Sequence, residues 1–201
     1  MQKDTLRYRI GVATYSVGVA YNNRKTSLQF IQQEMNNITA LSNETCQLGI
    51  QSRNMVLYIA KKDSPQPIRL MSSVGKQLPL YCTGLGRALL AYKSEEEIRS
   101  LFPEVLTAYT PHTIATINDL LKELELTRQR GYAVEHEETN LMVNCIAVSL
   151  DYNNAPIAAL SISIPTFRIS ESKEKEAVQI LWEAKQHIET HFKMYGVDFG
   201  N

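Results

Sequence analysis

Residues 78–91 read Leu78-Pro79-Leu80-Tyr81-Cys82-Thr83-Gly84-Leu85-Gly86-Arg87-Ala88-Leu89-Leu90-Ala91, an extended lead-in with a proline followed by two glycines and a run of strong helix formers. Thr83 can cap this helix, and the glycines let backbone N–H groups face a ligand without an intervening Cβ. A helix N-terminus with free N–H groups suits a carboxylate or a phosphate. The stretch therefore predicts a loop-to-helix junction that binds an acid group.

The composition bounds the class of protein. The chain has 201 residues, enough to bury one sizeable core with a short extra element at either end. Lys plus Arg and Asp plus Glu number 21 each, so the chain lacks the basic field that a nucleic-acid surface requires. No apolar run is long enough to span a membrane, and the polar start is unlike a signal peptide. Three cysteines without a Cys-x-x-Cys pair indicate reduced thiols, and hence a cytoplasmic protein.

Apolar residues at three- and four-residue spacing predict helices. The clearest helix covers residues 27–41, and its apolar side carries Leu28, Ile31, Met35 and Ile38. Residues 12–21 form a shorter helix that is apolar around most of its circumference, which requires cover on more than one side. Three later helices begin at residues that can cap them, namely Ser94, Thr116 and Ser170.

Elsewhere the apolar residues alternate with a period of two, which predicts strands. Residues 45–50 and 55–60 form a hairpin, and a second hairpin joins residues 144–151 to 156–164. Further strands are expected at residues 7–10, 68–71 and 132–137. Helices and hairpins in this order predict an α+β domain in which helices pack on an antiparallel sheet.

Small polar residues gather on one face of the later strands. Residues two apart in a strand share a face, so Ser161 and Ser163 point away from the apolar set of their own strand. Cys145 and Glu135 likewise lie on the face opposite to the apolar residues of their own strands. A face with two hydroxyls, a thiol and a carboxylate leaves room for a small polar ligand. The backbone N–H groups of the glycine loop could donate hydrogen bonds to an acid group of that ligand.

Each of these features has an ordinary structural explanation when taken alone. A strand serine is usually a satisfied polar residue, a lone cysteine usually a small apolar one, and a lone glutamate usually solvated. The Gly-Leu-Gly turn lacks the third glycine of a dinucleotide site, because Leu89 stands there. His187 and His191 have the spacing of a metal pair, but His-Ile-Glu-Thr-His is not His-Glu-x-x-His, so a structural role is preferred.

Taken together, the motifs resemble the effector-binding domain of the IclR family of bacterial transcription regulators, from about Tyr8 to Ile188. Residues 78–91 are similar to the family pattern L-P-x-H-A-T/S-A/G-x-G-K-A-L-L-A. Thr110-Pro111 and Thr113-Ile114, then Leu120 to Leu124 and Arg128-x-x-Gly131-Tyr132-Ala133, resemble its middle stretch. Three further stretches resemble the closing signature of the family, namely Glu137-Glu138, Cys145-Ile146-Ala147-Val148 and Ala158-Ala159-Leu160-Ser161-Ile162-Ser163.

The resemblance implies a GAF-like fold and a pocket for a small carboxylate effector, a 2-oxo acid or a sugar acid, with no metal or other cofactor. Carried over position by position, the ligand-binding residues are Gly84, Leu85, Glu135, Cys145, Ser161 and Ser163. Family members often have Asp in place of Glu135, glycine in place of Met142 and Ile164, and His in place of Thr139. These departures bear on the identity of the ligand more than on its site.

The resemblance also implies a division of the chain, since the family carries a winged helix-turn-helix domain that is not found here. We expect residues 1–11 to be the end of that domain, 12–24 a linker helix, 25–195 the effector-binding domain and 196–201 a C-terminal tail. The chain would then be a fragment of a longer repressor or activator. Its partners would be a second copy, as homodimer or tetramer, and DNA only through the absent domain. The helix at 12–21 is a natural dimer contact, although docking on its own domain is an equal alternative.

An enzyme is the rival interpretation. Cys145 beside Glu135, or Cys82 near a helix N-terminus, could be an activated thiolate that acts on a 2-oxo acid. A cysteine nucleophile normally needs a base, and the strand pattern places His136 on the face opposite to Glu135. The sequence therefore favours a sensor without enzymatic activity.

Overall fold

The computed structural model describes residues 11–22, 27–67 and 73–197. The helices are α1 (Val12–Asn22), α2 (Ser27–Ser42), α3 (Gly84–Leu90), α4 (Glu95–Leu101), α5 (Ile117–Arg130) and α6 (Glu171–Tyr195). The strands are β1 (Thr45–Ser52), β2 (Met55–Lys62), β3 (Gln77–Pro79), β4 (Ala133–His136), β5 (Val143–Tyr152) and β6 (Ala155–Pro165). Two single turns of 3₁₀ helix, η1 (Leu80–Cys82) and η2 (Thr166–Arg168), complete the set.

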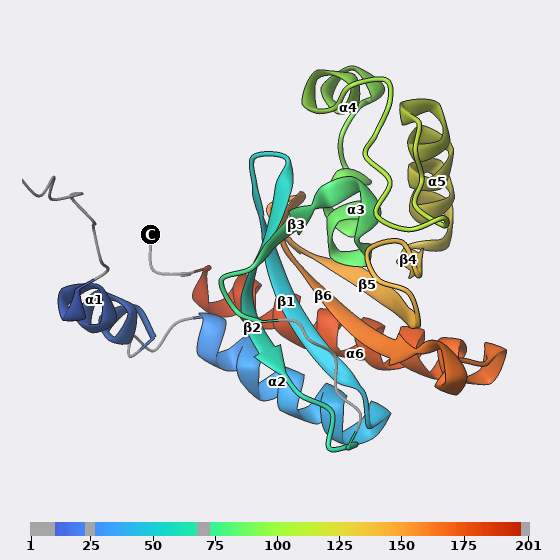
Figure 1. Ribbon diagram of the computed structural model, residues 1–201. Coiled ribbons are helices and arrows are strands. Elements are labelled where there is room, and N and C mark those ends of the chain that lie inside the picture. The colour runs from blue at the N-terminus through green and yellow to red at the C-terminus, as the bar shows by residue number, and fades with distance from the viewer. Residues whose placement is uncertain (1–10, 23–26, 68–72, 198–201) are drawn as a thin grey trace, which may run out of the picture.

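One sheet organises the domain. Its order is β3-β2-β1-β6-β5-β4, and every neighbouring pair is antiparallel. Helices α2 and α6 lie together on one side of the sheet, and α3, α4 and α5 lie on the other (Figure 1). The predicted α+β class, with helices packed on an antiparallel sheet, is confirmed.

The two faces of the sheet have separate apolar cores. Ile146, Leu160 and Ile162 face α2 and α6, together with the apolar side of α2 that the sequence predicts. Ala133, Ala147 and Ala159 face α3, where small side chains let the helix approach the strands. Side chains of β5 and β6 therefore alternate between two buried faces of the sheet. One face is apolar throughout, and the other is partly polar.

Local signals placed most elements correctly. Thr83, Ser94, Thr116 and Ser170 each cap a helix as predicted, and the reciprocal capping box of Ser94 and Glu97 is present. Both hairpins form, and Asn153 and Asn154 supply the left-handed backbone that the tight β5–β6 turn requires. The strands expected at residues 7–10 and 68–71 lie outside the described residues. Strand β3 was not predicted as a strand, although it coincides with the extended lead-in to the glycine loop.

None of the helices in the described part of the chain combines the length and the apolar character that crossing a membrane requires.

The junction between η1 and α3 depends on close backbone contact. A Cβ at Gly86 would lie 2.1 Å from the carbonyl oxygen of Leu80, so only glycine fits. A Cβ at Gly49 in β1 would lie 2.5 Å from the Val56 side chain of β2 and 3.1 Å from the Leu85 side chain of α3, so this glycine leaves room for both side chains. Thr83 then fixes the first turn by accepting the N–H of Gly86 at 3.1 Å.

We expect Gly86→Ala to lower the free energy of unfolding by about 3 kcal/mol or more, because the new methyl group collides with backbone that cannot move independently. Urea titration followed by circular dichroism measures this loss. Gly18→Ala is the control, since a Cβ at Gly18 in the exposed helix α1 meets nothing within 4 Å. Equal stability of the two variants would contradict the close contact at Gly86.

Candidate ligand-binding site

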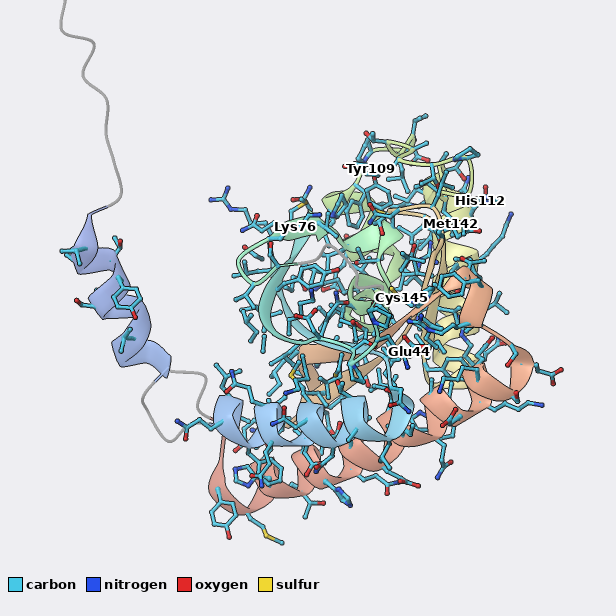
Figure 2. All side chains as sticks on the ribbon, turned by 60° about the horizontal axis from the view of Figure 1, so that its bottom comes forward. Glu44, Lys76, Tyr109, His112, Met142 and Cys145 are labelled. Carbon is cyan, nitrogen blue, oxygen red and sulfur yellow. The ribbon has the colours of Figure 1, made fainter. Side chains whose placement is uncertain are left out.

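The strand register brings the predicted site residues of the sheet together. Glu135 pairs with Cys145, Cys145 pairs with Ser163, and Gln47 of β1 pairs with Ser161. These four strands lie side by side, and the face that they share is the one covered by α3 (Figure 1). Figure 2 shows Cys145 in the interior of the domain, and the backbone of Gly84 packs on it: a Cβ at Gly84 would lie 3.3 Å from the Cβ of Cys145.

A hydrogen-bonded cluster joins the two serines. The hydroxyls of Ser161 and Ser163 donate to the same side-chain oxygen of Gln47, over 3.3 and 3.0 Å. The Sγ of Cys145 lies 3.1 Å from the Oγ of Ser163. Both serines are buried, whereas Cys145 is partly exposed.

Glu135 is buried and holds the β4–β5 turn, residues 137–142. Its Oε1 accepts the N–H groups of Glu138 at 2.6 Å and Thr139 at 3.2 Å. Burial raises the pKa of Glu135, and these N–H groups oppose that rise only in part. The carboxyl group therefore has a structural task in the turn as well as a place in the cluster.

Arg87 is the largest fully buried side chain among the described residues, and it connects α3 to this turn. Its Nε donates to the carbonyl of Tyr81 at 3.0 Å, and one terminal nitrogen donates to the carbonyl of Val134 at 2.9 Å. The other terminal nitrogen lies 2.5 Å from Glu138 Oε2. Glu138 Oε2 also accepts the N–H of Ile114 at 3.1 Å, so the loop between α4 and α5 is held by the same carboxylate.

The glycine loop meets the sheet through its backbone. Gly84 and Leu85 are both buried, and they begin α3, where the first N–H groups of a helix have no intrahelical acceptor. Because Gly84 and Gly86 each allow a close contact with a neighbouring element, the glycines serve packing in the first place. The use of the Gly84 and Leu85 amides by a ligand stays a prediction.

All six predicted residues therefore lie around one junction of α3 with the sheet. Sequence reasoning missed Gln47, Tyr58 and Arg87. Gln47 falls on the same face as the serines by the alternation of β1, which would have identified it. Tyr58 lies close enough to Cys145 and Glu135 for their charges to raise its pKa, in addition to the larger effect of burial. Arg87 carried no signal of its buried partner, because Glu138 is 51 residues away in the chain.

The two candidate nucleophiles lack the properties of activated thiols. Burial, followed by the neighbouring carboxyl of Glu135, raises the pKa of Cys145 well above its ordinary value. The same causes, with a contribution from Glu138, raise the pKa of Cys82 to about 12. His136 pairs with Asn144 in the register and contacts its Oδ1 at 3.0 Å, on the face opposite to Cys145. The arrangement does not favour a cysteine nucleophile.

The histidines of α6 have protein partners. His191 stacks on Phe30 with ring centroids 4.0 Å apart, and His187 Nδ1 lies 3.6 Å from Glu34 Oε2. Within residues 11–22, 27–67 and 73–197, no group of three or more His, Cys, Asp or Glu side chains could hold a metal ion.

Comparison with known proteins gives one consistent family. The model of the bacterial transcriptional regulator IclR C-terminal family matches residues 20–190. The HTH-type transcriptional regulator KdgR of Dickeya chrysanthemi is 34% identical over 184 residues, which are 90% of this chain and 60% of that protein. The HTH-type transcriptional repressor AllR of Escherichia coli K12 is 32% identical over 185 residues, 91% of this chain and 68% of that protein.

A solved structure agrees with these relatives. The C-terminal domain of the E. coli transcriptional regulator KdgR superposes with a TM-score of 0.74 at 32% identity, covering 82% of this chain and 96% of that domain. The matched part of the present chain corresponds to 60% of the length of the Dickeya KdgR regulator.

We expect Arg87→Met to lower the free energy of unfolding by about 3–5 kcal/mol, because Glu138 is left as a buried carboxylate without its cation. Chemical denaturation measures the change. Arg99→Met is the matched control, since Arg99 pairs with Glu95 and Glu104 on the surface and its loss should cost far less. A loss for Arg87→Met as small as that of the control would contradict the role of Arg87.

The raised pKa of Glu135 predicts a pH-dependent effect of Glu135→Gln. The folded state binds the proton of Glu135 more tightly than the unfolded state, whose pKa is near 4.5, so this group lowers stability as pH rises above 4.5. Glutamine removes that loss, and the stability of the variant relative to the original protein should increase with pH. Denaturant titrations from acidic to neutral pH measure the difference. A difference in stability that does not change with pH would contradict the effect of burial on Glu135.

Proposed function

The chain belongs to the IclR family of bacterial transcriptional regulators, and from this premise we propose that it senses a small carboxylate effector, a 2-oxo acid or a sugar acid. The observation that carries the proposal is the convergence of Gly84, Leu85, Glu135, Cys145, Ser161 and Ser163 at the junction of α3 with the sheet. The division proposed from the sequence accompanies it: 1–11 as the end of a DNA-binding domain, 12–24 as a linker, 25–195 as the sensor and 196–201 as a tail.

In this proposal the acid group of the effector meets neutral donors. The serine hydroxyls already donate to Gln47, so they can turn to a carboxylate oxygen without breaking any contact with a charged group. The amides of Gly84 and Leu85 complete the contact. Glu135 faces ligand hydroxyls, and its raised pKa reduces the repulsion between its carboxyl group and an anionic ligand.

Binding would be coupled to the DNA-binding part through the sheet. Strands β1, β5 and β6 carry the proposed ligand contacts on one face and pack on α2 and α6 with the other. A ligand that fits one arrangement of these strands better than another shifts the balance between the two arrangements. We propose that the shift changes the relative placement of two or more copies, and with it the affinity for an operator.

A thermal shift experiment tests the site. A ligand whose free concentration is about 100 times its Kd stabilises the folded state by about 2.7 kcal/mol, which raises Tm by several degrees. We expect one compound among a panel of 2-oxo acids and sugar acids, including pyruvate and gluconate, to produce such a rise. The rise should be lost in the Ser161→Ala/Ser163→Ala double variant, compared with that variant's own Tm.

Ser149→Ala is the matched control, because Ser149 is a buried serine on the same sheet face that bonds to Tyr92 and Lys185, outside the cluster. It should retain the full rise. A rise that persists in the double variant would place the ligand elsewhere, and no rise with any compound would reject the proposed effector class.

A further inference from the structure

We propose that Tyr58 is a further ligand-binding residue, and that its hydroxyl donates a hydrogen bond to an effector oxygen at carbon 2, next to the carboxylate. The proposal rests on the proposed function and narrows the effector class. It selects acids that carry a keto or hydroxyl oxygen at carbon 2 over acids that lack one. It arises from a tyrosine that is packed tightly beside the site while the protein leaves its hydroxyl unused.

Tyr58 lies on the sheet face that carries the other site residues. In the register of β1 and β2 it pairs with Gly49, which is two residues from Gln47 on the same face of β1. Tyr58 also belongs to the apolar cluster under α3, together with Leu85 and Ala147. Since β1 lies between β2 and β6, Tyr58 borders the site from the side opposite to the serines.

The ring of Tyr58 is fixed, but its hydroxyl is free. The residue is 6% exposed, and no described residue forms a hydrogen bond with its hydroxyl. Among the described residues, the side-chain nitrogen and oxygen atoms that are enclosed by protein and also lack a partner are Thr39 Oγ1 and Asp151 Oδ1. The Tyr58 oxygen is not one of these, so it borders open space. A rigid side chain with a free donor is the preorganised contact that a binding site requires.

The surroundings of the hydroxyl keep it neutral. Burial, followed by the charges of Cys145, Glu135 and Cys82, raises the pKa of Tyr58, so at neutral pH the hydroxyl retains its proton. A neutral phenol is a suitable donor to a keto or hydroxyl oxygen and adds no charge to the site.

The position of Tyr58 determines which oxygen it contacts. In the proposed function the serines of β6 and the first amides of α3 bind the carboxylate. Tyr58 comes from β2, with β1 between it and the serines. A ligand that contacts both sides must therefore carry oxygen on more than one carbon, and the nearest such position to a carboxylate is carbon 2.

The stability of Tyr58→Phe tests whether the hydroxyl is free. This change keeps the ring, so without ligand we expect Tm to stay within about 1 °C of the original value. Tyr81→Phe is the matched comparison, because Tyr81 is also 6% exposed and its hydroxyl donates to the carbonyl of Thr107 at 2.7 Å. Loss of that bond should lower Tm by about 2–4 °C. An equal loss for Tyr58→Phe would mean that the protein itself uses the hydroxyl, and would overturn the proposal.

Isothermal titration calorimetry then tests the contact with two pairs of acids. Propionate is pyruvate without the oxygen at carbon 2, and 2-deoxygluconate is gluconate without it. We expect Tyr58→Phe to raise the Kd of pyruvate or gluconate about three- to tenfold, and to leave the weaker binding of the matched acid unchanged. Tyr152→Phe is the control, since Tyr152 packs on the opposite core with α2 and α6, and every Kd should stay the same.

The outcomes separate this proposal from the proposed function. If pyruvate or gluconate binds and Tyr58→Phe leaves its Kd unchanged, the role of Tyr58 is overturned while the sensor function stands. A Kd that rises equally for both acids of a pair would likewise overturn the contact with the oxygen at carbon 2. If neither pair binds to the original chain, the effector class is rejected, and the proposal with it.

Discussion

The buried guanidinium of Arg87 is the interaction on which the rest of the site depends. Its donors reach the η1 turn, strand β4 and the carboxylate of Glu138, and Glu138 in turn holds the loop between α4 and α5. Removing a cation from water is costly unless its donors are satisfied, so these contacts must form together. Helix α3, the β4–β5 turn and the α4–α5 loop are thereby fixed in one arrangement around the sheet face that carries Cys145 and the serines.

The shared face of the site was predictable because strand periodicity is a local property. Alternation alone places Ser161, Ser163, Cys145 and Glu135 on the same side of three neighbouring strands, and the structure agrees. The additional task of Glu135 was not predictable, because it depends on the path of the turn that follows. Gln47 could have been found by the same alternation, whereas the pairing of Arg87 with Glu138 is a long-range contact without a local pattern.

One departure from the family pattern, Met142, has a structural explanation in the β4–β5 turn. Met142 has φ of 67°, in the left-handed region where a side chain is strained, which accounts for the glycine that family members often have there. The backbone is held in this conformation from both sides: Glu137 Oε1 accepts the N–H of Met142 at 2.6 Å, and Thr166 donates its N–H to the carbonyl of Met142 at 2.9 Å. The surrounding contacts thus maintain a conformation that methionine alone would not adopt.

The contact between Gly86 and the backbone of Leu80 has a consequence for how such sensors diverge. Backbone atoms occupy the space that any side chain at position 86 would need, so the junction of η1 with α3 is closed to substitution. Cys145, Ser161 and Ser163, in contrast, project from strands whose hydrogen bonds do not depend on side-chain identity. Selection for a new effector can therefore change these side chains one at a time while the helix above them keeps its place. The range of molecules that the fold can recognise would then expand without any change in architecture.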